Sequence, residues 1–258
     1  QFTQKAGAIV REHNGFLIYA GGDDVLALLP LDDALAAAAA LQADYRAAFQ
    51  AHCIQKGYDV QSTLSGAIEF VHIRTPLTRV LQDAHQLLDD VAKDEVGRNA
   101  IAVRVWKPSG LALQWAMPWE KALDENDQVR ISAVAQQFAA QGDNAGNADG
   151  DDGGTRFSNK FFFRMQSLLQ RFTGADNTTL EALLLAEYLH SWGRLDKRTG
   201  QDIEALKASL HQLLEQCRQW QRPAAGQSAK PHPQHPINPD GALLVRFLAQ
   251  KGLDEERA

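Results

Sequence analysis

The sequence predicts an α+β fold followed by an all-α region. Through residues 1–116, short apolar runs of strand length alternate with longer amphipathic stretches, whereas from residue 117 onward helices and linkers are predicted. Two neighbouring strand runs are joined by Gly21-Gly22-Asp23-Asp24, a sequence typical of a tight hairpin. We therefore expect a first domain, residues 1–116, with helices on one face of a mostly antiparallel sheet, and a second, helical domain, residues 117–258.

Three helices are expected in the first domain, each with apolar spacing or end signals. Asn14-Gly15 ends the first as a C-cap, and Pro30 precedes the alanine-rich second helix. Thr75-Pro76 places proline in the first turn of the third, and Gly97 ends it. The expected helices are 2–13, 34–53 and 75–97.

Five strands are expected between these helices. Large or β-branched side chains dominate each run, and glycine or proline stands at the turns. Pro108-Ser109-Gly110 connects the last two runs as a second hairpin. The expected strands are 16–20, 25–29, 63–73, 100–106 and 111–115.

The second domain shows helical periodicity outside one loop and one linker. A low-complexity run of Gly, Asp, Asn and Ala predicts a mobile loop at 142–155, and a Pro/Gln/His-rich linker spans 223–239. Phe161-Phe162-Phe163 could offer stacking platforms for RNA bases, but at this spacing we expect core residues. The expected helices are 119–141, 157–172, 179–192, 201–221 and 241–251.

The composition limits the class of protein. The 258 residues are 45% hydrophobic and 22% charged, as in globular proteins, and the net charge of −6 argues against a protein that wraps nucleic acid over its whole surface. Cys53 and Cys217 are far apart and lack metal-ligand spacing. Since no run approaches the ~20 apolar residues of a membrane span and no signal peptide is recognisable, we expect a cytoplasmic protein without membrane association.

Asp23 and Asp24 are the strongest candidates for chemistry. Two adjacent carboxylates at a hairpin tip repel one another unless a cation lies beside them, and a pair of Mg²⁺ or Mn²⁺ ions is the usual solution. Gly21 and Gly22 would let a phosphate approach the backbone. The alternative is a turn without function, because glycine and aspartate are common turn residues.

These residues and four further motifs resemble one family. Residues 19–28 look like the signature hairpin of the polymerase/cyclase large subunit of type III CRISPR effector complexes, closest to the Cmr (III-B) branch. The other matches follow in order: Leu64-Ser65-Gly66-Ala67-Ile68, His72 with Pro76-Leu77, Ala92-Lys93, and Gly97-Arg98-Asn99-Ala100. The last three also resemble GGDEF nucleotide cyclases, which have a similar palm.

The resemblance implies a ferredoxin-like palm and a specific activity. The palm would convert ATP to cyclic oligoadenylates by two-metal nucleotidyl transfer when target RNA is bound, inside a complex with crRNA and other subunits, one of them a small helical subunit. The family also has a strand before the first helix that carries another metal-binding aspartate, and we expect this sequence to begin after that strand. We therefore expect this isolated chain to be inactive towards ATP. The sequence contains no His-Asp dipeptide of the family's HD nuclease domain, so DNA cleavage is not assigned to this chain.

The resemblance also assigns roles to individual residues. Asp23 and Asp24 would be the catalytic metal ligands. Ser65 and Gly66 could equally form a strand bulge, and Lys93 could be a solvated cation near a helix C-terminus. The nucleotide contacts would be Gly21, Gly22, Ser65, Gly66 and Lys93.

The sequence leaves two alternative functions open and contains one further acidic segment. The chain could be a non-catalytic scaffold subunit of the same complex, or a diguanylate cyclase. Asp-Asp-Val after Gly22, where GGDEF enzymes have Asp/Glu-Glu-Phe, and the long helical region both argue against a diguanylate cyclase. The acidic run 149–154 lacks flanking strands and fails the ligand pattern of a calcium loop, so we expect a solvated loop there.

Overall fold

The computed structural model describes residues 2–139, 159–171, 177–191, 200–222, 232–234 and 237–250. These group into two compact units, the first comprising Gln1–Val129 with Trp220–His232 and the second Arg130–Gln219 with Pro233–Ala258. The expected mobile loop 142–155 and most of the linker 223–239 lie outside the described residues. The domain boundary at residue 116 stays a prediction.

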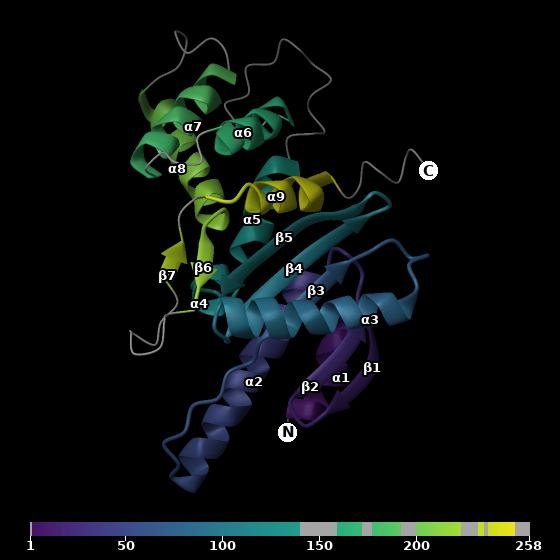
Figure 1. Cartoon of the computed structure of the whole chain (residues 1–258). Coiled ribbons are helices and arrows are strands. Elements are labelled where there is room, and N and C mark those ends of the chain that lie inside the picture. The colour runs from purple at the N-terminus through teal and green to yellow at the C-terminus, as the bar shows by residue number, and fades with distance from the viewer. Residues whose placement is uncertain are drawn as a thin grey trace. The chain divides into compact units, whose positions relative to one another are not determined.

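The first unit has the predicted order of elements (Figure 1). Helix, hairpin, helix, strand, helix and hairpin follow one another, which confirms the α+β class. The elements are α1 (Phe2–Glu12), β1 (Phe16–Gly21), β2 (Asp24–Leu28), α2 (Ala34–Lys56), β3 (Gly66–Phe70), α3 (Leu77–Gln86), the π-helical segment η1 (Leu87–Glu95), β4 (Ala100–Lys107), β5 (Gly110–Pro118) and α4 (Trp119–Ala122).

The strands of this unit form two separate sheets. β1 and β2 make an antiparallel hairpin, while β3, β4 and β5 make a mixed sheet with β4 in the centre. β3 and β4 are parallel because the helical run α3–η1 carries the chain back across the sheet, and β4 and β5 are antiparallel. No strand of the described residues joins the two sheets. The additional palm strand that the resemblance implies stays a prediction.

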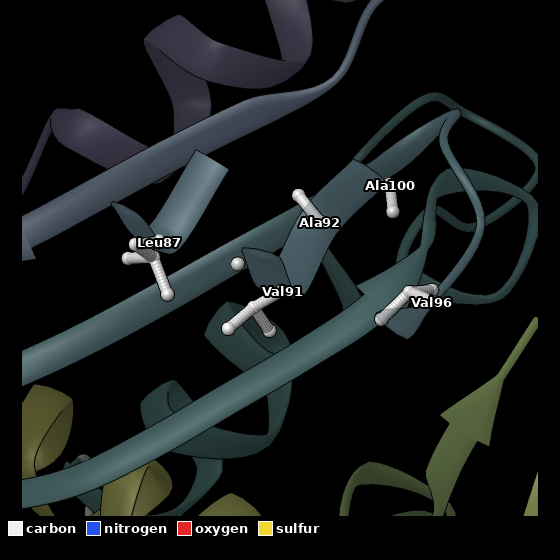
Figure 2. Close-up of a cluster of buried hydrophobic side chains, with 6 residues drawn as sticks. Leu87, Val91, Ala92, Val96 and Ala100 are labelled. Carbon is white, nitrogen blue, oxygen red and sulfur yellow. The ribbon is translucent and has the colours of Figure 1, made fainter. Parts of the chain in front are cut away.

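The core of the first unit lies between η1 and the three-stranded sheet. Figure 2 shows Leu87, Val91 and Val96 from the helical side, beside Ala100 at the start of β4; all four are buried. The alanines of β4 leave room for the larger side chains of η1, so helix and sheet pack closely. The opposite face of the sheet is also apolar and buried, through Ile101, Val103, Val105, Leu113, Trp115 and Met117.

The predicted single helix 119–141 is wrong. The structure has the short α4, then an irregular segment, and then α5 (Arg130–Ala139). Oδ1 of Asp124 accepts hydrogen bonds from the backbone N–H groups of Asn126 and Gln128, both at 2.8 Å, and Asp127 has a positive φ of 57°. A side chain that binds the backbone in this way replaces helical hydrogen bonds, so the helix is interrupted.

The second unit is helical in its described part. Its helices are α5, α6 (Asn159–Arg171), α7 (Asn177–Ser191), α8 (Gly200–Gln216) and α9 (Asp240–Gln250). Two short strands, β6 (Gln219–Gln221) and β7 (His232–Gln234), pair with each other, so the predicted helix 201–221 is wrong at its end, because α8 stops at Gln216. Phe161 and Phe162 are buried, which confirms their expected place in a core. Among the described residues, no helix is both long enough and apolar enough to cross a membrane.

Candidate functional site

The Gly-Gly-Asp-Asp segment forms the predicted tight hairpin. Gly21 pairs with Asp24, so Gly22 and Asp23 are the two turn residues. Gly22 has a φ of 66°, and no positive φ is found at Asp23; this matches a type II′ turn, which favours glycine at its first central position. The hydroxyl of Thr3 in α1 donates a hydrogen bond to the Gly22 carbonyl at 3.0 Å, which ties the tip to the first helix.

The two glycines of the hairpin are needed for different reasons. A Cβ at Gly22 would meet no atom within 4 Å, so only its backbone conformation requires glycine. At Gly21, by contrast, a Cβ would overlap the ring and hydroxyl of Tyr19, which lies two residues earlier on the same strand face. Of the two hairpin glycines, only Gly22 has a positive φ.

Asp23 and Asp24 lie exposed at this tip. Neither forms an ion pair with a cation of the described residues, so their negative charges are not compensated within the described chain. Carboxylate oxygens are the donors that Mg²⁺ and Mn²⁺ prefer, and the residues present therefore fit such ions. Within the described residues no group of three or more metal-capable side chains is found, so two carboxylates would leave further coordination positions to other oxygens.

Ser65 and Gly66 stand at the start of β3, where Gly66 pairs with Ile101 of β4. Both are half-buried. A Cβ at Gly66 would meet Trp119 at 3.6 Å, an ordinary contact distance, so the described neighbours do not require glycine there. The register of β3 with β4 is regular from Gly66 to Phe70.

Lys93 lies in η1, and its ammonium group pairs with Asp89 one helical turn earlier at 2.7 Å. The hydrogen bond and charge of Lys93 hold the pKa of Asp89 below its ordinary value. Among the described residues no hydrogen bond or ion pair connects Lys93 with the hairpin tip or with Ser65. A triphosphate contact by Lys93 stays a prediction, and it would have to share this ammonium group with Asp89.

The loop between η1 and β4 contains the Gly97-Arg98-Asn99 motif named above. Gly97, Arg98 and Asn99 all have positive φ, at 102°, 71° and 46°, and this conformation is unfavourable for the two residues with side chains. The backbone N–H of Trp119 donates to the Asn99 carbonyl at 2.8 Å and helps to hold the loop.

A pocket of about 230 Å³ beside this loop was not predicted. Gln42 of α2, Ser62 before β3 and Asn99 are among its lining residues. Gln42 is 5% exposed, and its Oε1 has no hydrogen-bond partner among the described residues. Because α2 and the loop are far apart in sequence, only the α+β topology could have indicated that they meet.

Comparison with known proteins agrees with this geometry. The family model for the second palm domain of Cas10/Cmr2 matches residues 1–102, which contain the hairpin, Ser65, Gly66 and Lys93. The chain is also 37% identical over 111 residues to the CRISPR system Cmr subunit Cmr2 of Pyrococcus furiosus; the match covers 43% of this chain and 12% of that relative. The expected resemblance is therefore confirmed. Residues 1–102 are therefore similar to the second palm domain of Cas10/Cmr2.

Proposed function

We propose that the chain is part of the catalytic palm of a type III CRISPR effector subunit that makes cyclic oligoadenylates from ATP. The observation that carries the proposal is the pair of exposed, uncompensated carboxylates, Asp23 and Asp24, on the hairpin of a domain similar to the Cas10/Cmr2 palm. Oxygen donors at a hairpin tip suit two Mg²⁺ or Mn²⁺ ions, and the exposed tip leaves space for a nucleotide.

In this proposal the residues of the chain bind and orient the reactants. Two bound ions would lower the pKa of an attacking ribose hydroxyl and stabilise charge on the leaving pyrophosphate. Asp23 and Asp24 hold the ions, and the bare backbone of Gly22 lets the triphosphate approach the tip. Ser65 and Gly66 offer a hydroxyl and open backbone, and Lys93 supplies positive charge for the triphosphate.

The partners belong to the same proposal. The relative named Cmr2 is a subunit of a Cmr system, so we propose that this chain works with other effector subunits, including a small helical one that docks on α5–α9. crRNA and target RNA would reach it through the assembled complex in the cytoplasm.

The test replaces both aspartates in the effector complex that contains the full-length protein. Asp23→Asn with Asp24→Asn keeps side-chain size and removes the charge that holds the ions, so cyclic oligoadenylate synthesis should fall by at least about 100-fold while target-RNA binding persists. Asp59→Asn with Asp90→Asn makes the same charge change at exposed positions elsewhere and should leave synthesis unchanged. Undiminished synthesis in the hairpin variant would refute the proposal.

A second candidate is a non-catalytic scaffold subunit. It is favoured by one observation, that the described residues hold no third acid beside Asp23 and Asp24. In that case both double variants would assemble normally, and neither would change synthesis by the complex. The same experiment therefore separates the two candidates.

A further inference from the structure

The end of the β3–β5 sheet away from Ser65 contains a pocket of about 320 Å³, here called the α3 pocket. Residues 71–83, which include the start of α3, form one side, and residues 106–110, which include the β4–β5 turn, form the other. Because β3 and β4 are parallel, both reach this pocket at their C-terminal ends. Ser65 and Gly66 stand at the opposite end of β3, so the α3 pocket is separate from those predicted nucleotide contacts.

Positive charge is concentrated around this pocket. Arg74, Arg79 and Lys107 line it, and none of them forms an ion pair with an acid of the described residues. The guanidinium of Arg79 lies over the ring of Trp106, 5.2 Å from its centroid, which fixes this cation at the pocket wall. In a chain with a net charge of −6, three uncompensated cations around one hollow indicate an anionic ligand.

Asp83, the acid that lines the pocket, is already neutralised. Its Oδ1 accepts from Arg104 at 2.8 Å, and its Oδ2 accepts from the indole N–H of Trp106 at 2.7 Å. Glu69 lies behind these groups, and its pKa is raised to about 8 by burial first and then by the neighbouring Asp83. Glu69 is therefore mostly uncharged at neutral pH, and the surroundings of the pocket stay positive.

The first turn of α3 adds to the attraction for an anion. The ten-residue helix begins after Pro76 without a side-chain cap and without an acid in its first turn. The first N–H groups of a helix have no partner within the helix, and they carry partial positive charge. Thr75 and Pro76, which lead into this turn, line the pocket beside Arg74.

We propose that the α3 pocket binds a phosphate group, carried either by a free nucleotide or by a nucleic-acid backbone. Arginine suits this ligand because its planar group of donors matches phosphate oxygens. The volume is well above that of a bare ion, so the pocket has room for the ribose or base that accompanies the phosphate. The proposal does not depend on the activity assigned to the hairpin.

The test measures binding to the purified 258-residue chain by calorimetry, with a chelator present so that no metal occupies the hairpin. The probes are inorganic pyrophosphate, AMP and an eight-nucleotide uridine RNA, with an oligoglutamate peptide as an anion of another class. We expect at least one phosphate-bearing probe to bind. Arg74→Gln and Lys107→Gln should each weaken it by about 5- to 10-fold, since each removes one exposed cation of the pocket.

Matched controls test whether the weaker binding comes from the α3 pocket itself. Lys56→Gln removes an exposed cation far along α2 in sequence and should bind like the unaltered chain. Asp23→Asn with Asp24→Asn should also leave binding unchanged, which distinguishes this site from the hairpin. Thermal unfolding of each variant confirms that its fold is retained.

The phosphate-bearing probes also distinguish a free nucleotide from a nucleic-acid backbone as the ligand, and they can refute the proposal. Binding of pyrophosphate or AMP indicates a free nucleotide, whereas binding of RNA alone, weakening steeply with salt, indicates a nucleic-acid backbone. The proposal is overturned if no phosphate-bearing probe binds, if Arg74→Gln and Lys107→Gln bind as well as Lys56→Gln, or if oligoglutamate binds more tightly than every phosphate-bearing probe.

Discussion

The indole N–H of Trp106 donates a hydrogen bond to Oε2 of Glu69 at 2.9 Å. The same N–H also reaches Asp83, so two carboxyl groups meet at a single donor on the half-buried side of the sheet. Two carboxyl groups this close favour a proton on one of them, and burial assigns that proton to Glu69, whose pKa rises from 4.5 to about 8.

Stability should therefore fall as pH rises from about 4.5 to about 8. In this window the folded chain keeps the Glu69 proton that the unfolded chain has lost, so each rise in pH favours unfolding. Glu69 is only half-buried, so solvent screening makes this loss smaller than the full pKa shift alone would give. Glu69→Gln mimics the protonated group, so urea unfolding at pH 5, 7 and 9 should show a smaller decline. Equal declines would contradict the assignment of the proton.

Leu87 should be among the most sensitive core positions. It is fully buried between η1 and the sheet, so Leu87→Ala should lower the free energy of unfolding by about 2–5 kcal/mol through lost burial and the remaining cavity. Its neighbour Leu88 is only partly buried against the same cluster, and Leu88→Ala should cost clearly less. Chemical denaturation measures both. A larger effect at Leu88 than at Leu87 would show that the helix is rotated relative to this structure.

The hairpin glycines should respond differently to alanine. Gly22→Ala meets open space but forces a positive φ on alanine, so it should cost about 1 kcal/mol. Gly21→Ala must displace Tyr19, and therefore Tyr19→Ala should restore much of the stability lost at Gly21 but none of that lost at Gly22. Double-mutant cycles by thermal unfolding measure this difference. Equal rescue at both glycines would contradict the contact between Tyr19 and Gly21.

Lys93 and Asp89 allow a structural role to be separated from a nucleotide contact. Lys93→Gln and Asp89→Asn both remove their exposed ion pair, and each should change the free energy of unfolding by only about 0.3–0.5 kcal/mol. In the effector complex, Lys93→Gln should raise KM for ATP several-fold, while Asp89→Asn should leave it unchanged or lower it by releasing the ammonium group. An equal change in KM in both variants would show that Lys93 acts only through its ion pair with Asp89 and does not contact the nucleotide.

The local parts of the fold could be predicted, because their signals lie within a few residues. Gly22 and its neighbours identified the hairpin, and Asn14 ends α1 with a positive φ of 55°, as a C-cap does. The interruption of the predicted helix 119–141 at Asp124 was not predicted, because the apolar spacing on either side indicates one helix. The Asp and Asn residues there are common in turns and are the local signal for the interruption.

The pockets could not be predicted, since each combines distant segments. Arg74, Asp83 and Trp106 come from a loop, a helix and a strand, and they meet at one pocket only because β3 and β4 are parallel neighbours. The same holds for Gln42 and Asn99 on the other pocket. A sequence indicates which residue types are present, but tertiary packing decides which charges remain uncompensated.

The separation of the hairpin from the three-stranded sheet has a consequence for cooperativity. β1 and β2 pair only with each other among the described strands, whereas β4 has a hydrogen-bonded neighbour on both sides and buried side chains on both faces. Backbone amides of β4 should therefore exchange with deuterium only on global unfolding of the first unit, while those of β1 and β2 exchange through much smaller openings. Asp23 and Asp24 therefore lie on a hairpin that can open without disrupting the buried core between η1 and the three-stranded sheet.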